Sequence, residues 1–253
     1  MENLIAIPEE LIAALRAAKR VAVLTGAGIS AESGVPTFRD AQTGLWAKYS
    51  PEELATPQAF RRDPRLVWEW YTWRREQLSS VKSNPGHVAL AGLEQLIPEF
   101  TLITQNVDGL HQQAGSKRVL ELHGNIRRSK CFEEDRLVEG WEDSKEVPPR
   151  CSRCGGLIRP DVVWFGEALP AEIFVEAERA SANCDVFFSI GTSSLVYPAA
   201  GLAYAALSSG AMVVEINPAP TSLTSEATYS FRAPAGKFLP ELIATVLGRS
   251  GRP

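Results

Sequence analysis

Short apolar runs alternate along this chain with segments whose apolar positions recur at helical spacing. The runs are rich in β-branched residues and predict buried strands at 20–25, 101–104, 119–124, 162–165, 186–190 and 212–216. Helical spacing predicts helices at about 4–15, 87–96 and 239–247. This alternation is typical of an α/β fold with a doubly wound, Rossmann-like, mostly parallel sheet. Glycine or polar residues follow most of the predicted strands, at the edge where such sheets bind ligands.

Two stretches interrupt the alternation and predict a smaller domain beside the sheet. The first, 38–83, is crowded with Trp and Tyr and divided by prolines, which predicts an inserted module of short helices. The second, 127–157, is highly charged and contains three of the four cysteines. The sheet domain would then comprise 1–37, 84–126 and 158–253.

Composition and charge exclude several classes of protein. The 253 residues carry 26 Lys and Arg against 30 Asp and Glu, a net charge of −4, which argues against binding dominated by nucleic-acid phosphates. No apolar run approaches the roughly 20 residues that cross a bilayer, and Met1-Glu2-Asn3 lacks the pattern of a secretory signal. A cytoplasmic location without membrane or nucleic-acid partners is therefore expected. Clustered cysteines in such a chain suggest a metal before a disulfide.

The first predicted strand ends in a glycine motif that suits a pyrophosphate. Gly26-Ala27-Gly28 allows a tight turn and close approach of the backbone, and Ala31 stands at the position of a third glycine. In dehydrogenases an acidic residue follows a second strand about 20 positions later. Here Asp40 lies in a loop-like stretch instead. The motif therefore predicts either a structural turn or a nucleotide site unlike that of the ordinary dehydrogenases.

A series of motifs in chain order resembles the sirtuin family of NAD-dependent protein deacylases. The resemblance runs from about residue 20 to 240, nearly the whole chain. The motifs are Gly26-Ala-Gly-Ile-Ser-Ala-Glu-Ser-Gly34-Val-Pro36-Thr-Phe38-Arg39, Thr104-Gln105-Asn106-Val107-Asp108-Gly-Leu110-His111, His123-Gly124, Phe165-Gly166-Glu167, Gly191-Thr192-Ser193 and Ile216-Asn217-Pro218. Because they occur together and in order, the resemblance extends to fold, co-substrate and site.

The resemblance implies that NAD is consumed as a co-substrate. The acyl oxygen of a modified lysine attacks the ribose carbon that carried nicotinamide, and water later releases lysine and O-acyl-ADP-ribose. His123 would be the general base for a ribose hydroxyl, because histidine is partly neutral near its ordinary pKa of about 6.5. Asn106 would orient the ribose or a water, and Asp108 would accept from the nicotinamide carboxamide.

Further residues are implied as NAD contacts by their place in the motifs. Phe38 would shield the reactive sugar carbon, Arg39 would bind the pyrophosphate, and Gln105 would bind a ribose hydroxyl. His111 would support the site without transferring a proton. The remaining implied contacts are Gly26, Ala27, Gly28, Ser30, Trp46, Val107, Gly191, Thr192, Ser193, Asn217, Pro218, Ala219 and Ala235.

Two segments resemble those with which sirtuins pair the backbone of a substrate peptide. They are Val163-Trp164-Phe165-Gly166-Glu167 and Ser194-Leu195-Val196. Recognition by strand addition reads main chain more than side chains. The expected partners are therefore acyl-lysine proteins or peptides, which would be recognised with little dependence on their sequences.

Tyr71 and Arg74 lie three residues apart on a predicted helix and so share a face. A Tyr-x-x-Arg pair at this place resembles the subgroup of sirtuins that prefer acidic acyl groups such as succinyl, malonyl or glutaryl. An arginine fork and a phenol together can hold a carboxylate. The alternative interpretation is a surface arginine beside a core tyrosine.

The cysteine module departs from the sirtuin pattern, which has two Cys-x-x-Cys pairs on a zinc ribbon. Cys151 and Cys154 form the second pair, but the partner position of Cys131 is Glu134. Structural zinc usually has four sulfur or nitrogen ligands, and carboxylate oxygen can also serve. The site would be completed by Glu134, Asp135 or water, would be weak, or would have lost zinc. We expect bound zinc in a zinc-ribbon-like module, with Cys184 as a small core residue.

Two other kinds of function stay open at this point. The same NAD pocket would serve a mono-ADP-ribosyltransferase or NAD glycohydrolase with a different acceptor. It would also serve a non-catalytic sensor of NAD or ADP-ribose. His123, Asn106 and Asp108 argue against a pure binder. The sequence does not encode the protein targets or the oligomeric state in readable form.

Overall fold

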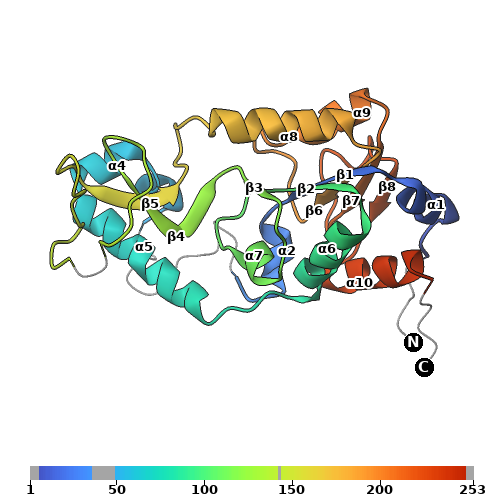
Figure 1. Cartoon of the computed structure of the whole chain (residues 1–253), viewed down its shortest axis with the longest axis horizontal. Coiled ribbons are helices and arrows are strands. Elements are labelled where there is room, and N and C mark those ends of the chain that lie inside the picture. Colours follow the sequence, from blue (N-terminus) through green and yellow to red (C-terminus); the bar gives the residue numbers. More distant parts are fainter. Residues whose placement is uncertain (1–5, 36–48, 142–143, 249–253) are drawn as a thin grey trace.

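A computed structural model of the chain describes residues 6–35, 49–141 and 144–248, with a parallel sheet as its largest element (Figure 1). The sheet has six strands in the order β3-β2-β1-β6-β7-β8, and every neighbouring pair is parallel. In that order they span Val119–Glu121, Glu99–Thr104, Arg20–Thr25, Val186–Ile190, Met212–Ile216 and Tyr229–Phe231. The predicted fold class is confirmed.

Helices cover both faces of this sheet because its strands are buried on both sides. Along β1, Val21 and Val23 join one core and Ala22 and Leu24 join the other, as the two-residue period of a strand requires. The first core is closed by α1 (Glu9–Ala17), α6 (Pro85–Leu96) and α10 (Ala235–Val246). The second is closed by α8 (Ala171–Asn183) and α9 (Gly201–Ser208), which lie along the opposite face (Figure 1).

A smaller unit lies beside the sheet and has its own core. Its strands β4 (Gly124–Cys131) and β5 (Ile158–Val162) pair antiparallel, and its helices are α3 (Pro51–Leu54), α4 (Pro57–Arg62) and α5 (Pro64–Ser79). Each helix begins at a proline, whose missing N–H costs nothing in a first turn. Side chains cap two of them: Thr56 accepts from Ala59 N at 3.0 Å, and Asp63 accepts from Leu66 N at 3.0 Å.

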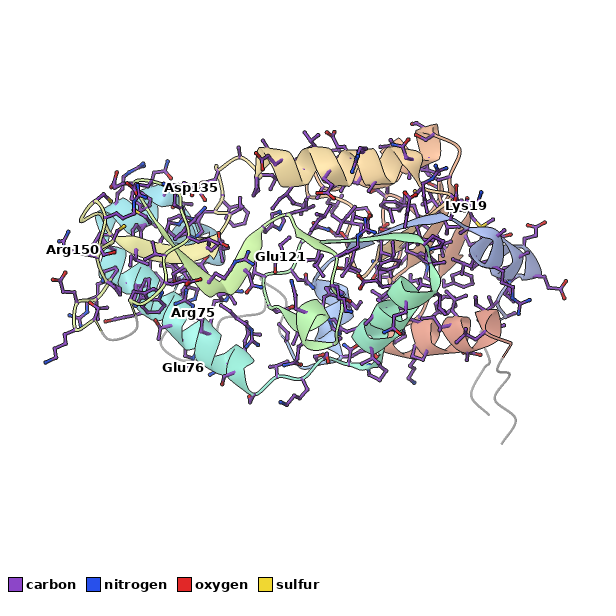
Figure 2. All side chains as sticks on the ribbon, viewed as in Figure 1. Lys19, Arg75, Glu76, Glu121, Asp135 and Arg150 are labelled. Atoms are coloured by element: carbon purple, nitrogen blue, oxygen red, sulfur yellow. The ribbon has the colours of Figure 1, made fainter. Side chains whose placement is uncertain are left out.

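Charged side chains bind the smaller unit to the sheet where β3 gives way to β4. Glu121 at the end of β3 pairs with Arg128 of β4 at 2.6 Å, and Arg128 also pairs with Asp161 of β5 at 2.9 Å. Arg75 of α5 donates to the Ile126 carbonyl at 2.6 Å. Figure 2 labels Glu121 at this junction and Arg75 on the helix beside it.

Three predicted strands, 20–25, 186–190 and 212–216, are confirmed with the same bounds, and the strand predicted at 101–104 begins earlier, at Glu99. The strand predicted at 119–124 is wrong as one element. It ends at Glu121, and the chain turns at Leu122 and His123 before β4 begins at Gly124. Gly124 has φ 76°, and a Cβ there would lie 2.2 Å from the Asp161 carbonyl oxygen. Only glycine permits the chain to leave the sheet in this way.

The strand predicted at 162–165 is displaced. The observed strand is β5, which ends at Val162 and pairs with β4 outside the main sheet. The backbone then leaves the strand because Trp164 N donates to the Glu167 carboxylate at 2.7 Å and Phe165 N donates to the Ala55 carbonyl at 2.9 Å. Helices α8 and α9 and strand β8 had no predicted counterpart. The domain boundaries at 37/38, 83/84, 126/127 and 157/158 stay a prediction.

Predicted helices at 4–15, 87–96 and 239–247 correspond to α1, α6 and α10, with shifted ends. Helix α10 begins at Ala235 and continues through Pro240. The short helices α2 (Ala27–Ala31) and α7 (Leu110–Gln113) follow β1 and β2. Within the described ranges, no helix has the length and apolar character that a bilayer span requires.

The turn after β1 touches the end of β6 backbone to backbone. Gly28 N donates to the Gly191 carbonyl at 2.8 Å, and a Cβ on Gly28 would lie 2.6 Å from Gly191 Cα. Gly191 has φ 59°, and a Cβ there would lie 2.4 Å from Ile29 N. Side chains at either position would push the two strand ends apart.

Gly28→Ala is expected to lower the free energy of unfolding by about 1–3 kcal/mol, because the added methyl group overpacks the contact with Gly191. Gly92→Ala in α6 is the matched control, because a Cβ there meets nothing within 4 Å. It is expected to raise the free energy of unfolding by up to about 1 kcal/mol. Equilibrium unfolding in urea measures both. A Gly28→Ala protein as stable as the parent would contradict the close approach.

Candidate functional site

Polar residues after four strands meet at the carboxyl edge of the sheet. Asn106, after β2, donates its side-chain amide to the Gly26 carbonyl at 3.0 Å and to Ser30 Oγ at 3.1 Å. Gln105 donates to Thr192 Oγ1, after β6, at 3.0 Å. These contacts follow from the level ends of β1, β2 and β6 in the register. The sequence-predicted residues of these segments are thus brought together.

The same edge fits a dinucleotide. The glycines at 26, 28 and 191 leave backbone where side chains would otherwise stand. Asn217, after β7, donates to the Thr192 carbonyl at 2.9 Å, so the β6 and β7 loops also lie side by side. Ser193, Pro218 and Ala219 are exposed in these loops. Backbone N–H groups and side-chain amides at such an edge are suited to phosphate and ribose oxygens.

Asp108 is buried beside the glycine turn and is anchored at both carboxylate oxygens. Oδ2 accepts from Ser30 Oγ at 2.7 Å, and Oδ1 accepts from Leu110 N at 2.9 Å. Burial raises the pKa of Asp108, although these hydrogen bonds act in the opposite direction. Ser30 therefore joins Asn106 and Asp108 into one polar cluster.

His123 lies in the turn between β3 and β4, and its ring is oriented by a carbonyl. Nδ1 lies 2.8 Å from the Gln105 carbonyl oxygen, which can only accept, so Nδ1 carries the proton in the neutral ring. Nε2 is then the basic nitrogen. Burial lowers the pKa of His123, while its bond to Gln105 raises it in part. The residue is thus held neutral at pH 7 with a defined proton-accepting atom.

Two further histidines lie buried beneath the edge and do not expose a basic atom to it. Their ring centroids are 4.8 Å apart, and burial lowers the pKa of His87 to about 4 and that of His111 to about 3. His111 Nε2 lies 2.9 Å from Thr25 Oγ1, which donates to Thr104 Oγ1 at 2.8 Å. His111 thus bonds to the end of β1 beside β2, and the supporting role expected for it stays a prediction.

The loop after β7 is organised by a buried glutamate that the sequence pattern did not single out. Glu215 is 1% exposed and accepts from Ser230 Oγ at 2.5 Å, from Thr224 Oγ1 at 2.8 Å and from Thr221 Oγ1. Arg232 pairs with Glu215 at 3.3 Å and donates to the Ala219 carbonyl at 2.9 Å. The sequence signal that could have identified Glu215 was the presence of an acidic residue within the apolar run 212–216.

Ala235, which the motifs implied as a contact, is buried at the first position of α10. Its neighbour Gly236 donates its N–H to Glu32 Oε1 at 2.7 Å, which joins α10 to the segment that follows α2. Val107 is held near the same edge because its carbonyl accepts from Ile126 N at 2.9 Å. Three other predicted contacts, Phe38, Arg39 and Trp46, lie outside the described residues.

The two segments expected to pair with a peptide differ in character. Val163 N donates to the His123 carbonyl at 2.9 Å, which places the first segment directly beside the histidine. Phe165 is 49% exposed, whereas Trp164 is 2% exposed and lies in the core of the smaller unit. Leu195 is 65% exposed in the second segment. Because the N–H groups of 163, 164 and 165 bond within the chain, peptide pairing here would rely on carbonyl oxygens.

Tyr71 and Arg74 lie on one face of α5, as their spacing predicts. The Arg74 guanidinium carbon is 5.6 Å from the Tyr71 ring centroid and 5.0 Å from that of Trp70. Burial lowers the pKa of Arg74 and raises that of Tyr71. Tyr71 accepts from Trp164 Nε1 at 2.9 Å, so the phenol lies against the segment next to His123.

Cys131, Glu134, Cys151 and Cys154 form one candidate metal cluster, and their ligand atoms all lie within 4.8 Å of one another. Cys131 and Cys151 each begin the same kind of turn. In both turns the cysteine N–H donates to the carbonyl five residues on, at 2.8 Å. Its own carbonyl accepts from the N–H four residues on, at 3.0 and 2.9 Å. Glu134 therefore occupies the position equivalent to Cys154.

This donor set is consistent with a structural zinc, because three thiolates and one carboxylate would give the ion its usual four ligands. Glu134 also pairs with Arg153 at 3.2 Å. Asp135, the other candidate ligand, pairs with Lys130 at 2.6 Å and is not part of the cluster. Cys184 lies elsewhere, in the core against α8 and α9.

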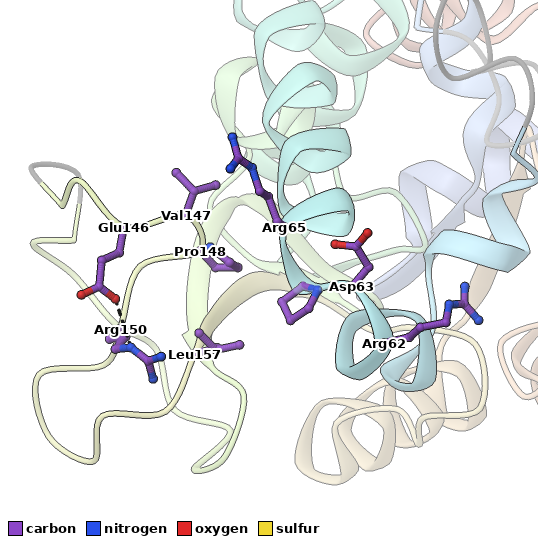
Figure 3. A pocket seen from close by; sticks show the side chains of 9 residues that line it. Arg62, Asp63, Arg65, Glu146, Val147, Pro148, Arg150 and Leu157 are labelled. Atoms are coloured by element: carbon purple, nitrogen blue, oxygen red, sulfur yellow. Dashed lines mark hydrogen bonds and ion pairs between the residues drawn. The ribbon is translucent and has the colours of Figure 1, made fainter.

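A cavity of about 410 Å³ lies away from the sheet edge, between the start of α5 and residues 146–157 (Figure 3). Its charged lining is largely paired. Arg150 bonds Glu146 at 3.0 Å, and Arg65 bonds Glu69 at 2.7 Å. Asp63 is occupied as the cap of α5. The cavity contributes no residue to the site at the sheet edge.

Comparison with known proteins finds relatives over nearly the whole chain. The model of the Sir2 family matches residues 26–198. An NAD-dependent protein deacylase of Aquifex aeolicus is 52% identical over 216 residues, which cover 85% of this chain and 90% of the relative. An NAD-dependent protein deacylase of Methylococcus capsulatus is 49% identical over 253 residues, which cover 97% and 98% respectively.

Solved structures agree with the sequence relatives. A Sir2 homolog–NAD complex superposes with a TM-score of 0.88 at 45% identity, covering 96% of this chain and 95% of that chain. A Sir2 protein bound to acetylated peptide gives a TM-score of 0.84 at 32% identity, covering 97% of this chain and 100% of that chain. The similarity spans both the sheet and the smaller unit.

Protein purified without chelator is expected to contain about one zinc ion per chain, as a four-ligand structural site predicts. Cys151→Ser and Glu134→Ala are expected to lose zinc to a chelator faster than the parent. Glu134→Cys is expected to hold zinc at least as firmly. Cys184→Ser, remote from the cluster, is the matched control and keeps its zinc. A zinc content near zero in folded, active protein would refute the assignment.

Proposed function

The chain belongs to the Sir2 family of NAD-dependent protein deacylases, and on this basis we propose how its side chains divide the reaction and which acyl groups it prefers. NAD supplies the ADP-ribose that takes over the acyl group, with release of nicotinamide. The protein's own residues hold the dinucleotide at the sheet edge and move a proton at a defined atom. The geometry of His123 is the observation that carries this proposal.

His123 is the general base. Its Nε2 accepts the proton of a ribose hydroxyl as that oxygen forms a bond to the acyl carbon, and the ring becomes an imidazolium. The Gln105 carbonyl, 2.8 Å from Nδ1, keeps the ring in the required tautomer and stabilises the positive charge that develops. Because burial lowers the pKa of His123, the neutral form is present before the proton transfer.

Asp108, Asn106 and Ser30 bind the nicotinamide side of the dinucleotide. Ser30 and Leu110 each donate to one oxygen of the Asp108 carboxylate. A carboxylate oxygen has more than one acceptor site, so Asp108 can still accept from a carboxamide NH₂. Asn106 is held by the Gly26 carbonyl at 3.0 Å, which keeps its amide oxygen oriented toward a ribose or a water.

Tyr71 and Arg74 give the enzyme a preference for acidic acyl groups such as succinyl, malonyl or glutaryl. Tyr71 bonds to Trp164, which belongs to a segment expected to bind peptide, and the Arg74 guanidinium carbon lies 5.6 Å from the Tyr71 ring. Desolvation lowers the pKa of Arg74, so a carboxylate brought near its guanidinium would offset the cost of burying that charge. An acetyl group offers no such compensation.

The other expected contacts complete the proposal at the adenosine and pyrophosphate ends. The dinucleotide would also contact four residues that follow β6 and β7 or begin α10, namely Thr192, Ser193, Asn217 and Ala235. Arg39 would bind the pyrophosphate. Acyl-lysine peptides are the expected substrates, in keeping with the acetylated peptide bound by a similar Sir2 protein. A cytoplasmic location without nucleic-acid or membrane partners stays a prediction.

His123→Ala is expected to lower kcat for deacylation by roughly 10²- to 10⁴-fold, the usual loss when a general base is removed. NAD binding is expected to change little, because the glycine turn and Asn217 are untouched. Single-turnover assays and NAD titration separate the two effects. A variant that deacylates at the parent rate would remove His123 from the mechanism.

The same experiment has a pH readout. With its pKa lowered by burial, His123 stays neutral until the pH falls below its ordinary value of about 6.5. The acid limb of kcat/KM in the parent should therefore have its midpoint below pH 6.5. This limb should be missing from the residual activity of His123→Ala. A limb that persists in the variant would assign the titration to another group.

Arg74→Met is expected to lower the ratio of desuccinylation to deacetylation by about 10- to 100-fold, as loss of a charge-assisted hydrogen bond worth roughly 1.5–3 kcal/mol predicts. The measurement is kcat/KM on matched succinyl-lysine and acetyl-lysine peptides. Arg65→Met, at an exposed position of the same helix, is the control and leaves the ratio unchanged. A parent enzyme with a strong acetyl preference that Arg74→Met does not alter would overturn the proposal.

A further inference from the structure

Trp164, in the segment beside His123, bonds to Tyr71 on helix α5. We propose that Trp164 is a specificity-determining residue, whose indole N–H binds the Tyr71 oxygen and thereby directs the Tyr71 hydroxyl proton toward an acyl carboxylate. This inference rests on the proposed preference for acidic acyl groups. It gives Trp164 a role different from peptide-backbone pairing, in which a fully buried indole takes no direct part.

The hydrogen bond between the two side chains has only one polarity. Trp164 Nε1 lies 2.9 Å from the Tyr71 hydroxyl oxygen, and both residues are at most 2% exposed. An indole nitrogen can donate but cannot accept. The phenol oxygen therefore accepts from Trp164, and its own proton must be donated in another direction. A buried tyrosine hydroxyl normally finds such a partner.

The indole is held rigidly enough to impose this polarity. The Arg159 guanidinium carbon lies 3.3 Å from the centroid of the Trp164 ring. Glu167 binds Arg159 at 2.5 Å and also accepts from Trp164 N at 2.7 Å. Phe60 packs against the same ring at a centroid distance of 5.4 Å. Stacking, backbone anchoring and core packing together fix the direction of the indole N–H.

A carboxylate is the ligand group that can accept from both Tyr71 and Arg74. The Tyr71 proton and the Arg74 guanidinium belong to the same face of α5, with the guanidinium carbon 5.6 Å from the Tyr71 ring. Carboxylate oxygens only accept, so they can take both donors at once. Burial raises the pKa of Tyr71, which keeps the phenol protonated as a donor in neutral and mildly basic solution. An acetyl methyl group cannot accept a hydrogen bond from either donor.

Trp164→Phe tests the inference because it keeps an aromatic ring and removes the indole donor, together with part of the ring volume. We expect the ratio of kcat/KM for succinyl-lysine over acetyl-lysine peptide to fall by about three- to tenfold, as loss of one neutral hydrogen bond predicts. Trp68→Phe is the matched control, because Trp68 lies on the same helix as Tyr71 but packs against Trp141 at 5.0 Å. Its ratio should equal that of the parent.

A double-mutant cycle with Tyr71→Phe separates this inference from the proposed function. If Trp164 acts through the Tyr71 hydroxyl, Trp164→Phe has no further effect on the ratio in the Tyr71→Phe background. A full effect in that background, or an unchanged ratio in Trp164→Phe alone, overturns the inference. If Tyr71→Phe and Arg74→Met themselves leave the ratio unchanged, the proposed acyl preference has failed instead.

A second measurement uses the unaltered protein and does not depend on the folding of the variant. The indole ¹H–¹⁵N resonance of Trp164 should shift more on binding a succinyl-lysine peptide than on binding the matched acetyl-lysine peptide, because the first recruits the Tyr71 proton. Equal shifts with the two peptides overturn the inference.

Discussion

The level ends of the parallel strands are the constraint on which the rest of the site depends. Thr25 pairs with Thr104 and with Ile190, and Ile190 pairs with Ile216, so four loops emerge side by side. Loops this close touch through backbone, which is why glycines stand at 26, 28 and 191. The polar residues that follow these strands therefore lie close together at the same edge of the sheet. The level strand ends thus bring together the groups that can surround a dinucleotide.

Desolvation at this edge shapes its acid–base chemistry. The three histidines of the chain all have lowered pKa values because burial disfavours the imidazolium. What distinguishes His123 from the other two is its position in a turn at the rim, where a carbonyl fixes Nδ1. His111 lies below and bonds to the Thr25 hydroxyl at the end of β1, and His87 bonds to the Ser30 hydroxyl in α2. Burial makes all three neutral, and local hydrogen bonding decides which one can serve as a base.

In the smaller unit, helix α5 packs against both the metal cluster and Trp164. Trp68 of α5 packs in the core that contains Cys131 and Cys151, while Tyr71, three residues later, packs against Trp164. The segment between the cysteines is highly charged, and its Val138 and Trp141 pack against the same core. A zinc ion held by the cluster would therefore brace the helix that carries Tyr71 and Arg74.

The sequence by itself determined the strands β1, β6 and β7, the edge on which ligands bind and most of the polar groups there, because apolar runs and strand-end motifs are local signals. Only the tertiary structure decided that His123 lies in a turn, that β5 pairs with β4, and that Glu134 meets the three clustered cysteines. The Trp164–Tyr71 hydrogen bond and the Glu215 network likewise join residues from separate elements. Such contacts carry no signature in local spacing, because folding brings their partners together only after the elements have packed.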